Sequence, residues 1–313
     1  MRYIDYSQEY DDQVISLWNK ALFFDPININ IYRDKVLLDE NFDPKLCLLA
    51  VDGEALVGYI LGIKRKFPYM EKGLQEDTGW ISVMFVDKNY RRQGIGTRLY
   101  KEVEARLRER GVQKIILAAY SPNYFFGGVD EENYPEAKEF FAKMGYTSGN
   151  YHYSMGMDLS GFRLNEKIKQ KMELLNEKGY RFTNFDYSRA LELLEFLKDE
   201  FGGGWKRNAL LAMRNRTAED VIILVIDKND RICGFSMRAI DGNPERFGPI
   251  GIAKDKRNEG IGSVLLNYSF DQMRKNNIDR MFFMTTDDAG RRYYERNGLS
   301  LIRTVKEYNK QFY

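Results

Sequence analysis

The six-residue pattern Arg-x-x-Gly-Ile-Gly occurs twice in this chain of 313 residues. The first copy spans 91–96 and the second spans 257–262, so the two copies start 166 residues apart. A strand candidate precedes each copy, at 80–86 and at 247–253, and an amphipathic helix candidate follows it. A distinctive turn that recurs in the same context after about half the chain indicates a duplicated fold. The sequence therefore predicts two domains of one architecture.

The segments around the two copies also correspond. Upstream of each copy, two apolar runs flank a tight turn, at 46–63 and at 221–240, as in a β-hairpin. Downstream, short apolar strands at 114–118 and 280–284 precede a last helix. Each half is thus predicted to run strand, helices, hairpin, strand, glycine turn, helix, strand, helix, strand. This order predicts the α/β (α+β) class.

A charged stretch at 164–178 separates the two halves. Within it Leu164, Ile168, Met172 and Leu175 fall at helical spacing, which predicts a helix that ends at Gly179 and packs across the two domains. We therefore expect an N-terminal domain at 1–160, a linking helix at 161–179 and a C-terminal domain at 180–313.

Charge and hydropathy limit the possible partners. Lys and Arg number 48 against 46 Asp and Glu, so a net charge of +2 provides no field of one sign for nucleic acid or a membrane surface. The basic run at 64–66 is interpreted as a solvated strand end. Apolar runs such as 221–226 fall short of the ~20 residues of a membrane span, and the N-terminus resembles no signal peptide. We expect a cytoplasmic protein with no nucleic-acid or membrane partner.

The sequence predicts no metal centre. Cys47 and Cys233 lie far apart among apolar residues and are expected to be buried free thiols. The single histidine, His152, cannot form the histidine cluster that most zinc enzymes need, and its strand-like surroundings predict a structural role.

The glycine turn itself has a chemical implication. A strand that enters such a turn and then a helix directs unpaired backbone N–H groups at one point, where the helix dipole also favours an anion. Arg91 and Arg257 add positive charge beside the two turns. The spacing differs from a dinucleotide fingerprint, because Arg98 or Leu99 stands at the third glycine position, and no P-loop lysine follows. Another phosphate ligand is required.

These turns resemble the R/Q-x-x-G-x-G/A motif of the GCN5-related N-acetyltransferase (GNAT) family, which holds the pyrophosphate of coenzyme A. The resemblance covers nearly the whole chain, once per half, in a tandem plan similar to mycothiol synthases. It implies two domains, each with a mixed, mostly antiparallel central sheet flanked by helices, and a splayed strand pair that holds acyl-CoA. The implied cofactor is acetyl-CoA.

The resemblance also implies which residues bind acetyl-CoA, namely the splayed strand and the glycine turn of each half. In the first half they are Met84, Phe85, Val86, Arg91, Arg92, Gln93, Gly94, Ile95, Gly96 and Thr97. In the second half they are Ile250, Gly251, Ile252, Arg257, Asn258, Glu259, Gly260, Ile261, Gly262 and Ser263. Glu259 places a carboxylate near the phosphates, so charge favours binding in the first half.

The family places a tyrosine four residues before the glycine of its last helix motif, where its hydroxyl protonates the departing thiolate. By this resemblance Tyr294 is the candidate acid of the second half, and packing of the helix on the sheet is the alternative. Phe141 stands at that position in the first half and has no proton to give. Tyr134 is the candidate substitute there.

A loop at 121–135 is present only in the first half and is expected to border the acceptor side. Its aromatic and acidic residues suit a cationic amine, and Glu132 is a candidate base. A contact to the other domain is the alternative role for this loop.

Together these features predict direct transfer of an acetyl group from acetyl-CoA to an amine, in a complex that holds both substrates. The expected partner is a small-molecule or peptide amine. The alternative is that one or both halves bind acyl-CoA without turnover, as a sensor or scaffold.

Overall fold

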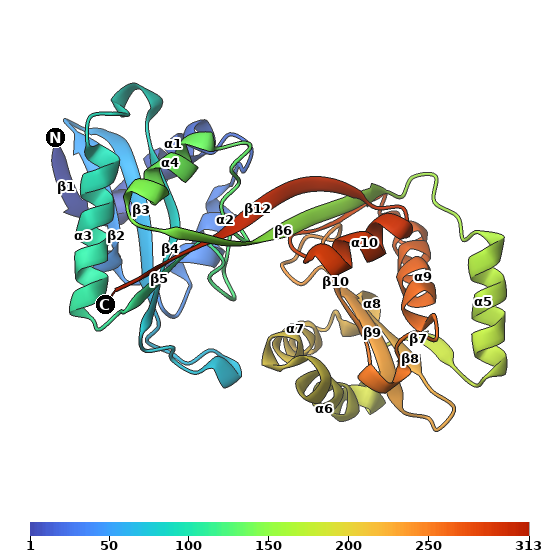
Figure 1. The fold of residues 1–313 in the computed structure, drawn as a ribbon. Helices are drawn as coiled ribbons and strands as arrows, with labels where there is room; N and C mark the ends of the chain where they lie inside the picture. The colour runs from blue at the N-terminus through green and yellow to red at the C-terminus, as the bar shows by residue number, and fades with distance from the viewer. Residues whose placement is uncertain (313) are drawn as a thin grey trace. The chain divides into compact units, whose positions relative to one another are not determined.

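The structure, a computed structural model, describes residues 1–312 and divides the chain into two compact units (Figure 1). The first unit contains Met1–His152 and the end of the chain from Thr304 onwards, and the second contains Tyr153–Arg303. Both follow the predicted order of elements, so the expectation of one mixed α/β fold used twice is confirmed.

The elements of the first unit begin with a strand, two helices and a hairpin. They are β1 (Arg2–Asp5), α1 (Asp11–Ala21), α2 (Ile29–Tyr32), β2 (Cys47–Asp52), β3 (Ala55–Lys64), β4 (Thr78–Val86), α3 (Ile95–Glu109), β5 (Lys114–Leu117), α4 (Pro135–Lys143) and the start of β6 (Thr147–Asp158). Those of the second unit repeat the series after one extra helix. They are the rest of β6, α5 (Glu166–Glu177), β7 (Arg181–Asn184), α6 (Ala190–Phe201), α7 (Gly203–Arg214), α8 (Ala218–Val221), β8 (Ile222–Ile226), β9 (Ile232–Arg238), β10 (Phe247–Ile252), α9 (Ile261–Lys275), β11 (Arg280–Phe283), α10 (Asp288–Arg296) and the start of β12 (Ser300–Gln311).

The sheet of the first unit has the strand order β1-β2-β3-β4-β5-β12-β6. Neighbouring strands from β1 to β4 are antiparallel, whereas β4 and β5 are parallel. The end of β12 pairs antiparallel with β5, with Asn309 opposite Ile116. In the second unit β7 to β10 form an antiparallel sheet, and β11 pairs with the end of β6, where Phe283 lies opposite Met155.

Each unit therefore contains a strand segment from the other half of the sequence. The end of β12 completes the first unit, and the end of β6 completes the second. β6 and β12 contain 12 residues each, about 40 Å at ~3.3 Å per residue, so one strand is long enough to serve first one unit and then the other. The units consequently differ from the contiguous division expected at 160 and 180. Periodicity shows where a strand lies but not which neighbour it pairs with, and pairing decides unit membership.

Helix α5 covers most of the stretch predicted as a linking helix. Asn165 caps its start, because its side chain accepts a hydrogen bond from the Ile168 amide at 2.9 Å. Met172 and Leu175 join a core cluster with Leu265 of α9. The buried face of this helix thus belongs to the second unit.

The core of the first unit depends on close packing of α3 against the sheet. Leu99, Val103 and Leu107 recur at helical spacing and are each 0% exposed. At Gly62 of β3 a Cβ atom would lie 2.5 Å from Val103 Cγ1, so only glycine allows this approach. The packed helix fixes the glycine turn from which it starts.

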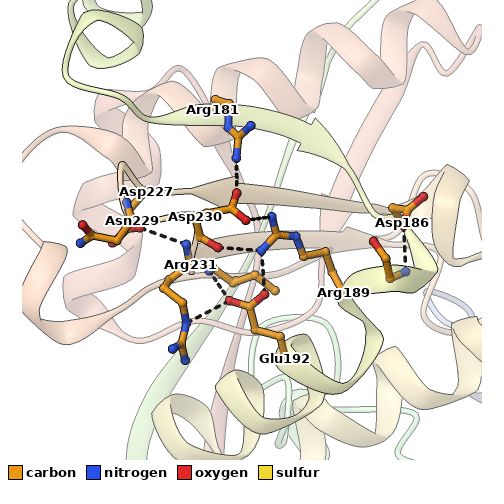
Figure 2. A network of polar contacts seen from close by, with 10 residues as sticks. Arg181, Asp186, Arg189, Glu192, Asp227, Asn229, Asp230 and Arg231 are labelled. Atoms are coloured by element: carbon orange, nitrogen blue, oxygen red, sulfur yellow. Dashed lines mark hydrogen bonds and ion pairs between the residues drawn. The ribbon is translucent and has the colours of Figure 1, made fainter.

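The outer edge of the second sheet carries a network of ion pairs (Figure 2). Asp230, in the β8–β9 turn, pairs with Arg181 of β7 and lies 2.6 Å from Arg189 before α6. Arg189 also lies 3.0 Å from Glu192, which accepts the backbone amide of Ile232 at 2.8 Å. These charges are partly or largely exposed, so the network orients the turn and contributes little stability per pair.

The remaining expectations concern isolated side chains. Cys47 and Cys233 are buried free thiols, as predicted, and burial raises the pKa of each to about 12. His152 Nε2 lies 2.7 Å from Glu307 Oε1, and this contact lowers the pKa of the glutamate. Over residues 1–312 no helix has the length and apolar character to cross a bilayer.

Because β12 completes the first unit, we predict that Tyr308→Ala destabilises that unit. Tyr308 is 4% exposed and packs in the α3 core cluster, so its truncation should lower the free energy of unfolding by about 3 to 5 kcal/mol. A Trp205→Phe background leaves Trp18 and Trp80 as fluorescence reporters of the first unit during urea unfolding. Leu301→Ala, 42% exposed, is the control. An unchanged transition in the Tyr308 variant would contradict the assignment of β12.

Candidate active site

A cavity of about 430 Å³ lies in the first unit where β4 and β5 diverge. Its wall comes from the end of β4, the turn before α3, helix α4 and the connection between β5 and α4. The lining residues that carry the argument below are Ser82, Met84, Val86, Arg91, Arg92, Gly94, Gly96, Ala118, Phe126, Gly128, Val129, Asp130, Tyr134 and Phe141.

The divergence of the two strands is visible in their pairing. β4 pairs with β5 only as far as Ile81, whose carbonyl accepts the Ala118 amide at 2.8 Å. The pairing of β4 with β3 skips Ser82, so this buried residue occupies a bulge that faces the cavity. Beyond the bulge β4 remains hydrogen-bonded to β3 on one edge only.

Backbone groups of β4 are consequently available on the other edge. The Asp87 amide donates to Val57 of β3 at 2.8 Å, and hydrogen-bonded pairs alternate along an antiparallel ladder. Met84 and Val86 therefore direct their N–H and C=O groups away from β3, toward the space that β5 has left, where the Val86 carbonyl accepts a hydrogen bond from Arg91 Nε. This is the geometry in which a strand-like ligand such as pantetheine extends a sheet.

The chain turns away after β5 through two residues in the left-handed region. Ala118 has φ 53° and Ala119 has φ 48°, each a conformation that costs about 1 kcal/mol or more for a residue with a Cβ. The Ala119 amide donates to the Phe126 carbonyl at 2.8 Å, which fixes the turn. Backbone strain is thus localised at the cavity wall.

The first glycine turn has the features of an anion cradle. Gly94 caps α3 with φ 82°, no side chain caps the first helical amides, and a Cβ at Gly94 would meet no atom within 4 Å. Arg91 Nε donates to the Val86 carbonyl at 3.2 Å, which ties the turn to β4. Open amides beside Arg91 and Arg92 fit the pyrophosphate of coenzyme A. Gln93, by contrast, is exposed and outside the cavity lining.

The two arginines face carboxylates on α4. Arg91 lies 3.4 Å from Glu136 and Arg92 lies 3.8 Å from Glu139, and all four side chains line the cavity. These pairs are exposed enough to exchange partners at low cost, so the guanidinium groups can turn to phosphates.

Tyr134, the candidate acid of the first half, lines the cavity at the start of α4. Its hydroxyl donates to Asp25 Oδ2 at 2.6 Å and accepts the Phe24 amide at 3.2 Å. The loop that carries Asp25 is held on α1, because Trp18 Nε1 donates to the Asp25 carbonyl at 2.8 Å. Asn19 fixes the next turn of this loop through two bonds with the backbone of Ile27.

The acidic residues Asp130 and Glu132 of the loop at 121–135 occupy different positions relative to the cavity. Asp130 is 5% exposed and lines the cavity, and it accepts the amides of Glu132 and Asn133 at 3.1 and 2.9 Å. Glu132 is exposed and is not among the cavity-lining residues. The structure therefore brings Tyr134 and Asp130 to the cavity but not Glu132.

Asp25 and Ser82 were not predicted from the sequence. Asp25 lies in a short loop with no motif, and its proximity to Tyr134, 109 residues later, arises only from tertiary packing. Ser82 occupies a bulge that strand periodicity cannot reveal. Phe23 and Phe24 precede Asp25, but their exposure becomes visible only in the structure, so no signal in the sequence pointed to Asp25.

Arg65 anchors the start of the cavity-lining loop. It is 5% exposed, its guanidinium lies 4.9 Å from the rings of Tyr69, Trp80 and Tyr120, and its Nη2 donates to the Ser121 carbonyl at 2.7 Å. Desolvation lowers its pKa. The prediction that 64–66 is a solvated strand end is wrong for Arg65, because the aromatic cage forms from residues distant in sequence.

The second glycine turn has the same backbone but different surroundings. Gly260 caps α9 with φ 85°, close to the 82° of Gly94. The side chain of Lys171, from α5, lies directly over Gly260, so that a Cβ there would overlap its Cε and Nζ. Glu259 accepts the Tyr180 hydroxyl at 2.9 Å.

The other predicted residues of the second turn and strand are also engaged locally. Arg257 Nε donates to the Ile252 carbonyl at 3.2 Å, as Arg91 does in the first unit. The Ser263 hydroxyl donates to Asn297 at 2.9 Å, and Ile261 is 1% exposed in the core. Asn258 has φ 67°, matching φ 63° at its counterpart Arg92.

Tyr294 lies on α10 with its ring centroid 4.5 Å from that of Phe283. Desolvation, with a smaller contribution from Asp287, raises its pKa to about 12. The neighbouring Tyr293 directs its hydroxyl toward Gly262 of the second turn, 3.5 Å from a Cβ placed there. In the first unit Phe141 lines the cavity and packs on Tyr146 at 5.4 Å.

Comparisons with known proteins agree with this geometry. A model of the Acetyltransferase (GNAT) family matches residues 11–146, and a model of the Acetyltransferase (GNAT) domain matches residues 219–298. The chain is 28% identical to N-alpha-acetyltransferase 30 of Dictyostelium discoideum over 162 residues, 50% of this chain and 76% of the relative. It is 33% identical to the Homo sapiens protein of that name over 118 residues, 37% of this chain but only 30% of the relative.

Solved structures support the tandem fold. The GCN5-related glucosamine N-acetyltransferase region of a fungal multi-domain β-N-acetylglucosaminidase has a TM-score of 0.81 at 19% identity, covering 98% of this chain and 38% of that one. A tandem GNAT protein from the clavulanic acid biosynthesis pathway has a TM-score of 0.64 at 13% identity, covering 99% and 98%. With a family match in each half, the chain belongs to the GCN5-related N-acetyltransferases, enzymes that use acetyl-CoA, and contains two such domains in tandem.

Proposed function

We propose that the first unit transfers an acetyl group from acetyl-CoA to the α-amine of a peptide, and that the second unit does not bind acetyl-CoA. The contrast between the glycine turns carries this proposal. The turn at Gly94 opens into a cavity, whereas Lys171 covers the turn at Gly260 and Glu259 adds a carboxylate there. Lys171 would have to move before phosphates could reach the second set of amides.

Binding uses the backbone more than side chains. The amides at the start of α3 and Arg91 and Arg92 would hold the pyrophosphate, and the free edge of β4 at Met84 and Val86 would pair with pantetheine. Acetyl-CoA, when bound, supplies the acetyl group as a thioester. A β4 amide would donate a hydrogen bond to the thioester carbonyl oxygen as negative charge develops on it. Because the amide is already oriented, this hydrogen bond lowers the activation free energy by about 3 kcal/mol.

The pair Asp25 and Tyr134 carries the proton that moves from the acceptor nitrogen to sulfur. The acceptor nitrogen forms a bond to the carbonyl carbon as the bond from that carbon to sulfur breaks, so one proton must leave nitrogen and one must reach sulfur. The ammonium form of the acceptor first loses one proton to solvent. As the neutral amine attacks, Asp25 takes the second nitrogen proton, Tyr134 gives its hydroxyl proton to sulfur, and Asp25 returns a proton to Tyr134 through their 2.6 Å hydrogen bond. The net result is transfer of one proton from nitrogen to sulfur, with both residues restored.

The acceptor class is supported by charge and by relatives. Asp130 lines the cavity, and Asp25 contacts the cavity-lining Tyr134, so two carboxylates lie in or next to this part of the wall, which suits a protonated amine. The curated relatives carry the name N-alpha-acetyltransferase, so a peptide α-amine is the acceptor proposed here. The peptide panel below determines which residues after the acceptor amine are preferred.

The direct test is release of coenzyme A thiol with a panel of decapeptides. The panel varies the first two residues with a free α-amine and includes matched peptides with a blocked α-amine and a free lysine. Thiol release with free α-amines only supports the proposal. Release with lysine peptides alone refutes the acceptor class, and tight acetyl-CoA binding without release from any peptide supports a sensor or scaffold instead.

We predict that Gly94→Val weakens acetyl-CoA binding at least about tenfold, whereas Gly260→Val does not. Valine at φ 82° distorts the start of α3 and places methyl groups over the amides that receive phosphate. Gly260, at φ 85°, is the control because its backbone conformation is the same, although valine there must also displace the end of the Lys171 side chain. Calorimetric titration should give one site in the wild type. Loss of binding in the Gly260 variant alone would move the site to the second unit.

We predict that Tyr134→Phe lowers kcat about 100-fold, the size typical of lost general acid–base catalysis, without changing the Kd of acetyl-CoA. Tyr294→Phe is the matched variant in the second unit, where Tyr294 remains the predicted acid from family resemblance. Single-turnover thiol release measures both. If Tyr294→Phe lowers kcat and Tyr134→Phe does not, the catalytic site lies in the second unit.

A further inference from the structure

We propose that the last strand of the chain, β12, positions the acceptor side of the first unit's active site. It does so by holding the loop between β5 and α4, residues 118–134, here called the acceptor loop. This inference rests on the proposed function of the first unit, because it concerns how that unit binds its acceptor. The residues of β12 act through the loop and touch no reacting atom.

The acceptor loop supplies much of the cavity wall. Its lining residues are Ala118, Phe126, Gly128, Val129, Asp130 and Tyr134. A segment of this length without a helix or strand loses conformational entropy for each residue that is fixed. A defined cavity wall therefore requires ties to the rigid sheet.

One tie is a pair of backbone hydrogen bonds. The Val129 amide donates to the Lys306 carbonyl and the Lys306 amide donates to the Val129 carbonyl, each at 2.8 Å. The approach is close, because a Cβ at Gly128 would lie 2.6 Å from the Lys306 oxygen and 2.9 Å from its carbonyl carbon. Backbone atoms cannot swing aside as a flexible side chain can, so residue 128 must be glycine for this contact.

A second tie uses side chains. The Tyr308 hydroxyl donates to Glu131, and Glu131 also lies 3.6 Å from Lys138 of α4. Tyr308 is buried, and its pKa is raised by desolvation and by the Glu131 hydrogen bond. Strand β12 thus contacts the loop on either side of Asp130, a cavity-lining residue.

The strand that makes these ties is itself rigidly placed. Asn309 pairs with Ile116 of β5, and the Phe312 amide donates to the Gln113 carbonyl at 2.8 Å. Since β5 pairs with β4, β12 fixes the acceptor loop relative to the strands that line the cavity. Arg65 holds the other end of the loop at Ser121.

The test uses the full chain and the peptide with the highest kcat/KM in the decapeptide panel. In Gly128→Ala the new Cβ forces the loop away from β12. We expect the acceptor KM to rise at least about fivefold, the Kd of acetyl-CoA to stay within about twofold, and hydrogen exchange of amides 118–134 to accelerate. Gly161→Ala is the control, because a Cβ there meets no atom within 4 Å.

A second set of variants leaves the backbone unperturbed, in case Gly128→Ala folds poorly. Tyr308→Phe and Glu131→Ala each remove the hydrogen bond and should raise the acceptor KM about threefold or more. Glu131→Gln keeps an acceptor oxygen at the same place and should restore the wild-type KM. A purely structural role of Tyr308 would lower the unfolding midpoint without this pattern.

The proposal is overturned if the acceptor KM stays within about twofold of wild type in Gly128→Ala, Tyr308→Phe and Glu131→Ala. Faster loop exchange with an unchanged KM overturns it as well, because the ties would then order the loop without serving the acceptor. Failure of the proposed function is separate: the wild type would release no thiol with any peptide. Exchange of amides 118–134 would in that case still decide whether β12 holds the loop.

Discussion

The divergence of β4 and β5 after Ile81 is the constraint on which the cavity of the first unit depends. While two strands are paired, their backbone groups satisfy each other and leave no edge for a ligand. Once β5 turns away through the left-handed Ala118 and Ala119, β4 keeps only β3 as a neighbour and offers its other edge to the cavity. The bulge at Ser82 and the open glycine turn at Gly94 both line the same cavity. A ligand with a strand-like arm and a phosphate end therefore finds both ends of its site on continuous backbone.

The two units show how one backbone is adapted to different surroundings. In the first, Phe85 of β4 stacks on Tyr59 at 5.1 Å. In the second, the corresponding strand has Gly251, and Phe201 from α6 fills the space, 5.3 Å from Phe235. Core volume is thus conserved by a side chain from another element. The glycine turns differ in a more consequential way, since the turn in the second unit is covered by Lys171. The two glycine turns share one backbone conformation, but Lys171 lies over the second turn only. The repeat alone therefore does not specify which unit is active.

The long strands give the first unit a dependence on the end of the chain. β12 contributes Lys306 and Tyr308 to the ties on the acceptor loop, although they follow that loop by more than 170 residues. The second half of the sequence therefore contributes contacts to the cavity wall of the first unit, whatever its own chemistry.

The sequence by itself determined the duplication, the order of elements, the two glycine turns and the strand that lines the site, because these depend on local patterns: periodicity, turn residues and helix starts. Resemblance to the family motif then indicated Met84, Val86, Gly94 and Tyr134 as site residues, and all four line the cavity. Tertiary structure alone decided which strand completes each unit, that Asp25 meets Tyr134, that Glu132 stays outside, and that Arg65 is caged rather than solvated. Each of these depends on contacts between residues far apart in the chain. Strand pairing and side-chain packing carry that information, and no local pattern encodes it.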